Sequence, residues 1–160
     1  VRVHGKGDHK YDNVRIGING RLDSLQAAIL LAKFDIFPEE IELRQTVADR
    51  YSTLLGPNSQ IKVPSLPSGA TSAWAQYSVL ATDEKQRNEM QNQLKEVGIP
   101  TAIYYPQPLH LQTAFSSLGY QAGDFPISED CARRIFSLPM HPYLTAEDQQ
   151  KIAGSMVHTA

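Results

Sequence analysis

The chain has 160 residues, 41% hydrophobic and 20% charged, a composition that predicts a folded core and excludes a fully disordered protein. A formal net charge of -2 at pH 7 and the lack of any apolar run as long as a bilayer is thick argue against nucleic-acid and membrane partners. The single cysteine, Cys131, excludes an intrachain disulfide and indicates a reduced, cytoplasmic protein.

The first segment, residues 1–20, is polar and glycine-containing without periodicity, so we interpret it as mostly loop. Because the chain begins at Val1 inside this loop, without a methionine, we expect it to be a piece of a longer protein. Apolar residues at helical spacing over residues 22–36 predict a helix capped by Asp23. Pro38 then predicts a kink or the start of a second helix.

Beyond the second helix, which Gly56 is expected to end, short strands and helices alternate. The runs "QIKV" and "AWAQYSVLAT" predict strands, and residues 83–97 predict a helix. "TAIYY" is a β-rich run, and residues 106–126 are expected to be irregular with one helical turn.

Two helices are predicted in the last part of the chain. One begins at Ser128 and places Ile135 and Phe136 on its inner face. The other is capped by Thr145. We therefore expect an α/β chain with an α+β layer, in which long connecting helices lead to a small sheet covered by helices.

The turn "GINGRLD" before the first helix carries two strong donors, Asn19 and Arg21. Turn and cap preferences explain its glycines and Asp23. They do not explain Arg21, because the helix dipole disfavours a cation at a helix N-terminus. Since guanidinium groups suit phosphates and carboxylates, the sequence predicts an anionic ligand near this turn.

The segment "IPTAIYYPQPLHLQ" places Tyr104, Tyr105 and His110 on a path that prolines make rigid. One interpretation is a binding wall, in which phenol and imidazole groups bind a polyhydroxyl ligand. The other is tyrosine packing at the end of a strand. "GDFPISED" and "FSLPMHPYLT" leave the same alternatives, and the five histidines show no ligand spacing, so we predict no metal site.

Several segments together resemble the C-terminal half of DegT/StrS-type nucleotide-sugar aminotransferases, which are fold-type-I, pyridoxal-phosphate (PLP)-dependent enzymes. They are "GINGRLDSLQAAIL", the tandem helix with "ADRY", "GIPTAIYYPQPLHLQTAF", "GDFPISE" and "SLPMHPYL", in the family's order. The resemblance implies a residual loop of the large domain over residues 1–20, connecting helices over 21–56, and a small domain over 57–160.

The resemblance also implies site residues. Asn19 would reach into the neighbouring subunit and bind the cofactor phosphate, and Arg21 would approach the substrate in that same site. The family's aromatic pair, often His-Tyr, lines the sugar pocket and is here Tyr104-Tyr105, so a contact that needs an imidazole at the first position is lost. His110 and His4 are further substrate-binding candidates.

The family's Schiff-base lysine lies upstream of the segment that this chain resembles, so the isolated chain is expected to lack the catalytic residue and to be inactive. The whole protein would be a homodimer that uses PLP and transfers an amino group from glutamate to an oxo-sugar nucleotide, UDP-linked, for bacterial surface polysaccharide. Two alternatives stay open: a PLP-dependent sugar dehydratase of the same family, and a non-catalytic module for dimerisation or sugar-nucleotide binding.

Overall fold

The computed structural model describes residues 7–8, 14 and 16–157. The chain divides into two compact units, the N-terminal unit Val1–Glu39 and the C-terminal unit Glu40–Ala160. Within the described part, no helix combines the length and the apolar character that crossing a bilayer requires.

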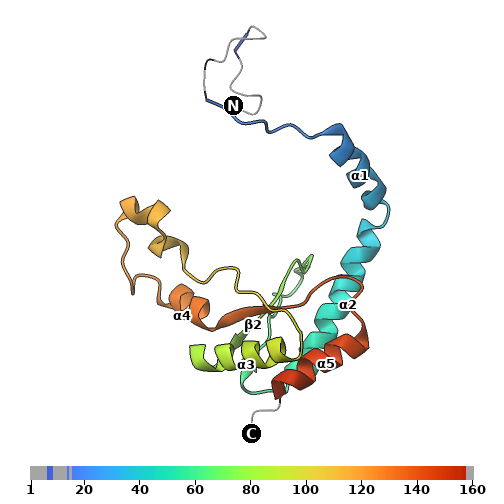
Figure 1. Ribbon diagram of the computed structural model, residues 1–160, viewed down its shortest axis with the longest axis vertical. Coiled ribbons are helices and arrows are strands. Elements are labelled where there is room, and N and C mark those ends of the chain that lie inside the picture. Colours follow the sequence, from blue (N-terminus) through green and yellow to red (C-terminus); the bar gives the residue numbers. More distant parts are fainter. Residues whose placement is uncertain (1–6, 9–13, 15, 158–160) are drawn as a thin grey trace. The chain divides into compact units, whose positions relative to one another are not determined.

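Two successive helices follow the glycine-flanked turn (Figure 1). In α1 (Ser24–Phe34), the Leu25 amide donates to Asp23 Oδ1 at 2.8 Å, which confirms the predicted cap. The second helix, α2 (Phe37–Leu55), starts one residue before Pro38 and ends before Gly56, as predicted. Proline is tolerated there because first-turn amides have no partner within the helix.

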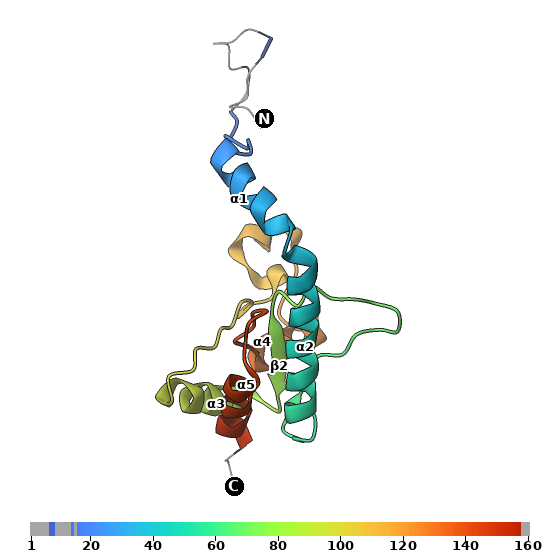
Figure 2. The ribbon, with the colours of Figure 1, turned by 90° about the vertical axis from the view of Figure 1, so that its right-hand side faces the viewer.

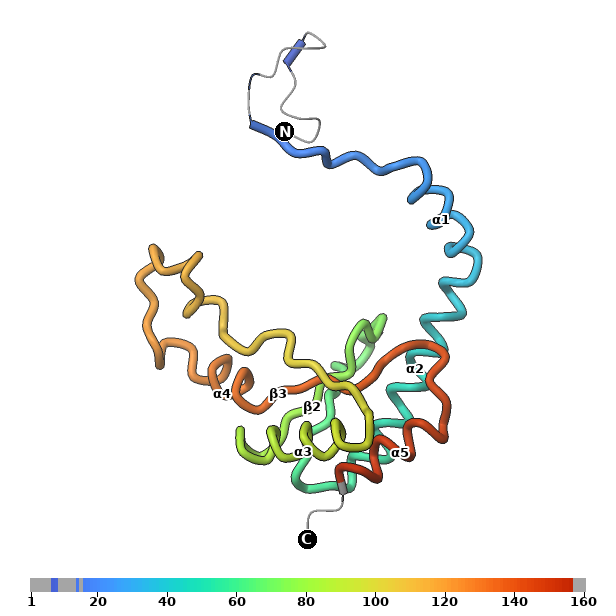
Figure 3. The backbone as a smooth tube through the Cα atoms, viewed as in Figure 1, coloured from blue at the N-terminus to red at the C-terminus, as the bar shows by residue number. Residues whose placement is uncertain are grey.

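The C-terminal unit contains a three-stranded antiparallel sheet in the order β1-β2-β3. Its register pairs Val79 with Phe136. Figure 3 traces how the chain passes through the elements of this unit after α2. They are β1 (Ile61–Lys62), β2 (Tyr77–Ala81), α3 (Glu84–Glu96), η1 (Leu109–Leu111), η2 (Thr113–Leu118), α4 (Pro126–Arg134), β3 (Ile135–Leu138) and α5 (Ala146–Val157).

One hydrophobic core joins the sheet to α2, α3 and α5. The rings of Tyr51 and Tyr77 lie 4.9 Å apart between α2 and β2, and both side chains are fully buried. The Tyr51 hydroxyl donates to the Pro139 carbonyl at 3.0 Å, and burial raises its pKa above the ordinary value. Helices α3 and α5 lie side by side below the sheet (Figures 1 and 2).

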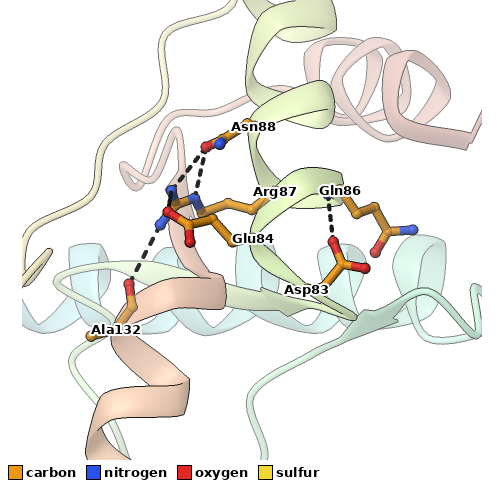
Figure 4. A network of polar contacts seen from close by, with 6 residues as sticks. All are labelled: Asp83, Glu84, Gln86, Arg87, Asn88 and Ala132. Carbon is orange, nitrogen blue, oxygen red and sulfur yellow. Dashed lines mark hydrogen bonds and ion pairs between the residues drawn. The ribbon is translucent and has the colours of Figure 1, made fainter. Parts of the chain in front are cut away.

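Buried Arg87 connects α3 to α4 (Figure 4). Its guanidinium lies 3.4 Å from the Ala132 carbonyl, near the C-terminal end of α4, and 3.2 Å from Glu84 of its own helix. Asp83 caps α3 by accepting from the Gln86 amide at 2.8 Å, as the predicted helix start requires. The Arg87–Ala132 contact joins α3 to α4.

The predicted helix from Ser128 is partly wrong. The observed helix begins at Pro126 and ends at Arg134, and Ile135 and Phe136 belong to β3 instead. A β-branched and an aromatic residue favour a strand, and pairing with β2 buries Phe136 fully. The helical spacing predicts a longer helix, but the pairing of these residues with β2 outweighs this local preference.

The "TAIYY" run is also less regular than predicted. Only Ala102 pairs, in an isolated bridge with Ser137 of β3. Prolines at positions 100, 106 and 108 lack the amide donor that a ladder needs, which explains why the strand does not extend. The irregular stretch that follows has helical turns in η1 and η2, in agreement with the prediction of a turn there.

Candidate functional site

In the turn before α1, the side chains of Asn19 and Arg21 contact each other. Arg21 Nε donates to Asn19 Oδ1 at 2.9 Å, and both side chains are exposed. The contact assigns the amide oxygen to Arg21 and directs the amide NH2 away from it. Both residues line an open hollow of about 200 Å³ together with Leu22, Asp23 and Ser24. A guanidinium beside an amide donor suits an anion such as a phosphate.

A second hollow, of about 200 Å³, opens in the C-terminal unit beside the Ala102–Ser137 bridge. Tyr104 lines it and is 55% exposed. Tyr105 is 65% exposed and does not line it. Three further segments line it: the residues before β2, the residues around the Ala102 bridge, and the end of β3 with the two residues after it. They contribute Ala75, Gln76, Pro100, Thr101, Ala102, Ser137, Leu138, Pro139 and Met140.

His110 is packed into the protein. Its side chain is 8% exposed, and its ring centroid lies 4.8 Å from that of Phe125. His110 Nε2 lies 3.1 Å from Glu129 Oε1 of α4. Because an ionised carboxylate only accepts, Nε2 carries the proton in this contact. The imidazole therefore belongs to the packing of α4 and not to the lining of the Tyr104 hollow.

Glu129 accepts hydrogen bonds from several groups of the loop that precedes α4. The Gly123 amide donates to Glu129 Oε1 at 2.8 Å and the Phe125 amide at 3.4 Å, in addition to His110. The Gly123 amide, helped by the His110 ring and the Phe125 amide, holds the pKa of the Glu129 carboxyl below its ordinary value. Glu129 is thus ionised at neutral pH.

Trp74 positions one wall of the Tyr104 hollow, and sequence reasoning missed it. Its φ of 45° is unusual for a bulky residue, and its surroundings hold it there. The indole donates to Gln45 Oε1 at 2.7 Å and the carbonyl accepts from Arg44 at 2.9 Å, both on α2. Trp74 thereby directs Ala75 and Gln76 into the hollow. Its only sequence signal is that it is the single tryptophan of the chain.

Three further points of the sequence analysis concern His4, metal binding and the lysines. His4 lies outside the described residues. Among the residues that are described, no three His, Cys, Asp or Glu side chains gather where they could hold a metal ion. The described lysines do not line the Tyr104 hollow, and Lys85, for example, lies on the surface of α3 at 3.7 Å from Glu89.

Comparison with known proteins assigns a family to this arrangement. Residues 1–157 match the DegT/DnrJ/EryC1/StrS aminotransferase family. The chain is 40% identical over 158 residues to UDP-2-acetamido-2-deoxy-3-oxo-D-glucuronate aminotransferase of Pseudomonas aeruginosa, and the match covers 99% of this chain and 42% of that protein.

Solved structures similar to this chain are also aminotransferases of this kind. A DegT/DnrJ/EryC1/StrS aminotransferase from Brucella abortus is 51% identical, with a TM-score of 0.80 over 96% of this chain and 40% of that one. NtdA from Bacillus subtilis, solved with bound cofactor PMP, is 26% identical, with a TM-score of 0.78 over 98% of this chain and 37% of that one. The chain spans about two-fifths of the length of these relatives. It belongs to the DegT/DnrJ/EryC1/StrS aminotransferase family and carries part of the fold-type-I aminotransferase fold.

Proposed function

We propose that the whole protein is a cytoplasmic, homodimeric, PLP-dependent aminotransferase. It transfers an amino group from glutamate to the oxo group of a UDP-linked sugar, for bacterial surface polysaccharide. The observation that carries this proposal is the 40% identity, over nearly the whole chain, to an aminotransferase named for a UDP-linked 3-oxo sugar. PLP supplies the means of carrying the amino group between the two substrates.

In this proposal Asn19 binds the cofactor phosphate in the neighbouring subunit, and Arg21 binds an anionic group of the substrate there. The geometry of the turn supports it, because an amide donor and a guanidinium lie side by side on an exposed hollow. The Arg21 contact orients the Asn19 amide so that its NH2 can donate to a phosphate oxygen.

Tyr104 and Tyr105 form the sugar-binding wall in the proposed enzyme. Both residues are more than half exposed, so their rings can pack against a pyranose ring while the hydroxyls hydrogen-bond its oxygens. His4 is proposed as a further substrate contact on the family resemblance alone. His110 does not line the Tyr104 hollow, and its ring contacts Glu129 of α4.

The activity is tested on the whole protein with glutamate and a panel of UDP-linked and dTDP-linked oxo sugars, with the product analysed by mass spectrometry. We expect an amino sugar to form from a UDP-linked 3- or 4-oxo sugar. A product that has lost water without gaining nitrogen would instead support the dehydratase alternative. Sugar-nucleotide binding without turnover would support the non-catalytic module.

The shared active site is tested by subunit complementation. One subunit carries a substitution of the upstream cofactor-binding lysine, and the other carries Asn19→Ala. If Asn19 serves the neighbouring site, the mixed dimer has one site with both groups intact and regains about half of the wild-type activity. If Asn19 serves its own subunit, neither site is intact and the mixed dimer stays as inactive as the parents.

A further inference from the structure

The tyrosine segment, residues 103–108, contains Tyr104 and Tyr105 and has neither helix nor strand. It is held at both ends. Before it, Ala102 and Ser137 of β3 exchange two backbone hydrogen bonds, with N···O distances of 3.2 and 2.7 Å. After it, His110 of η1 contacts Glu129 of α4 at 3.1 Å. Since β3 directly follows α4, both anchors belong to one continuous stretch of chain.

That stretch is itself attached to the rest of the C-terminal unit. Arg134, at the end of α4, donates to the Ala81 carbonyl of β2 at 2.8 Å and pairs with Asp130. Arg87 of α3 holds the Ala132 carbonyl (Figure 4). The two anchors of the tyrosine segment are therefore fixed relative to the sheet.

Glu129 also holds the loop that returns from the tyrosine segment to α4. Its Oε1 atom accepts from the Gly123 and Phe125 amides as well as from His110, and its side chain is only 14% exposed. Charge-assisted hydrogen bonds of this kind are stronger than neutral ones. Because Pro106 and Pro108 also restrict the backbone, the path of the tyrosine segment depends on where Glu129 holds His110.

We propose that Glu129 is a positioning residue for sugar binding, which acts through His110 to hold Tyr104 and Tyr105 in place. This inference rests on the proposed function, because the two tyrosines contact the sugar only if that proposal holds. Glu129 itself touches neither substrate nor cofactor. Its effect is on the substrate-binding wall and not on the amino-donor half of the reaction.

The test compares variants of the whole protein. Glu129→Gln removes the charge, and His110→Leu removes the donor while leaving Glu129 in place. His110→Gln is the conservative variant, because its amide NH2 can replace the Nε2 donor. Glu147→Gln is the matched control: Glu147 lies in the first turn of α5, as Glu129 lies in the first turn of α4, but unlike Glu129 it is exposed.

Two readouts are measured: amide hydrogen exchange over residues 103–125, and the kinetics of the two half-reactions. We expect Glu129→Gln and His110→Leu to speed exchange in this region and to raise KM for the sugar nucleotide on the order of tenfold. The half-reaction with the amino donor should be unchanged. His110→Gln should restore slow exchange and a low KM, and Glu147→Gln should match the wild type.

Unchanged exchange in Glu129→Gln and in His110→Leu would overturn the inference, as would equal losses in both half-reactions. If one of these variants does not fold, the other decides. A wild-type protein that aminates no oxo-sugar nucleotide would overturn the proposed function instead. If Tyr104→Phe and Tyr105→Phe leave KM unchanged while Glu129→Gln speeds exchange, the anchoring is correct but the sugar-binding role of the tyrosines fails, and the inference fails with it.

Discussion

Arg87 is a buried cation whose donors are used by the protein itself. It is 8% exposed and contacts Ala132, Glu84 and Asn88. We expect Arg87→Met to lower the free energy of unfolding by about 1–3 kcal/mol, because the Ala132 carbonyl loses a charged donor and α4 loses its link to α3. Urea unfolding of the chain measures the loss.

Lys85 on the same helix provides the control for Arg87. Its contact with Glu89 is 3.7 Å long and its side chain is 87% exposed, so solvent screens the pair. Lys85→Met should change the free energy of unfolding by less than about 0.5 kcal/mol. Equal effects of the two substitutions would contradict the connecting role of Arg87.

Gln149 is a fully buried amide with both ends satisfied. Its Nε2 donates to the Val47 carbonyl at 2.8 Å, and its Oε1 accepts from Arg50 at 2.6 Å, so it joins α5 to α2. We expect Gln149→Leu to cost about 1–3 kcal/mol in unfolding free energy, since Arg50 loses its acceptor. The neighbouring exposed Gln150→Leu is the control and should be nearly neutral in the same thermal and urea unfolding measurements.

At the scale of elements, α4 and the loop before it should respond to acid through Glu129. Its folded-state pKa lies below its ordinary value because of the Gly123 amide, the His110 ring and the Phe125 amide. The stability it contributes is therefore complete above the ordinary carboxyl pKa and is lost as the pH falls through the lower folded-state value.

The measurement is the unfolding free energy of the chain and of Glu129→Gln between pH 3 and 7. We expect the two curves to lie furthest apart near neutral pH and to converge in acid. The Asp130 pKa is also lowered, mainly by its hydrogen bond with Arg134, but this group is common to both proteins and cancels in the difference. A constant separation at all pH values would show that Glu129 does not titrate in the way described.

Helix starts were predicted better than strands because the capping residues that mark a helix start lie next to it in sequence. Asp23 and Asp83 cap α1 and α3 where the sequence placed them, and Thr145 contacts Asp148 at the start of α5. The β3 strand was missed because its stability comes from pairing with β2, which lies far away in sequence. A helical apolar spacing that runs into Ile135 contains no information on that partner.

At the scale of the whole molecule, we expect the isolated chain to have no aminotransferase activity. The family resemblance places the Schiff-base lysine upstream, so we expect no transamination and no lysine-cofactor absorbance when PLP is added to the isolated chain. Borohydride reduction followed by peptide mass spectrometry tests this. A stoichiometric cofactor adduct on one lysine of this chain would contradict it.

The family, the helix starts at Asp23 and Asp83, and the presence of an amide and a guanidinium in the turn before α1 can all be read from the sequence. The helix starts and the turn depend on residues close together in the chain, and the family on the order of several such segments. The fold was needed to show that Ile135 and Phe136 form a strand, that His110 packs against Glu129, and that Trp74 shapes the hollow beside Tyr104. Each of these depends on contacts between distant segments, whose free energy comes from burial and hydrogen bonding that no local pattern encodes.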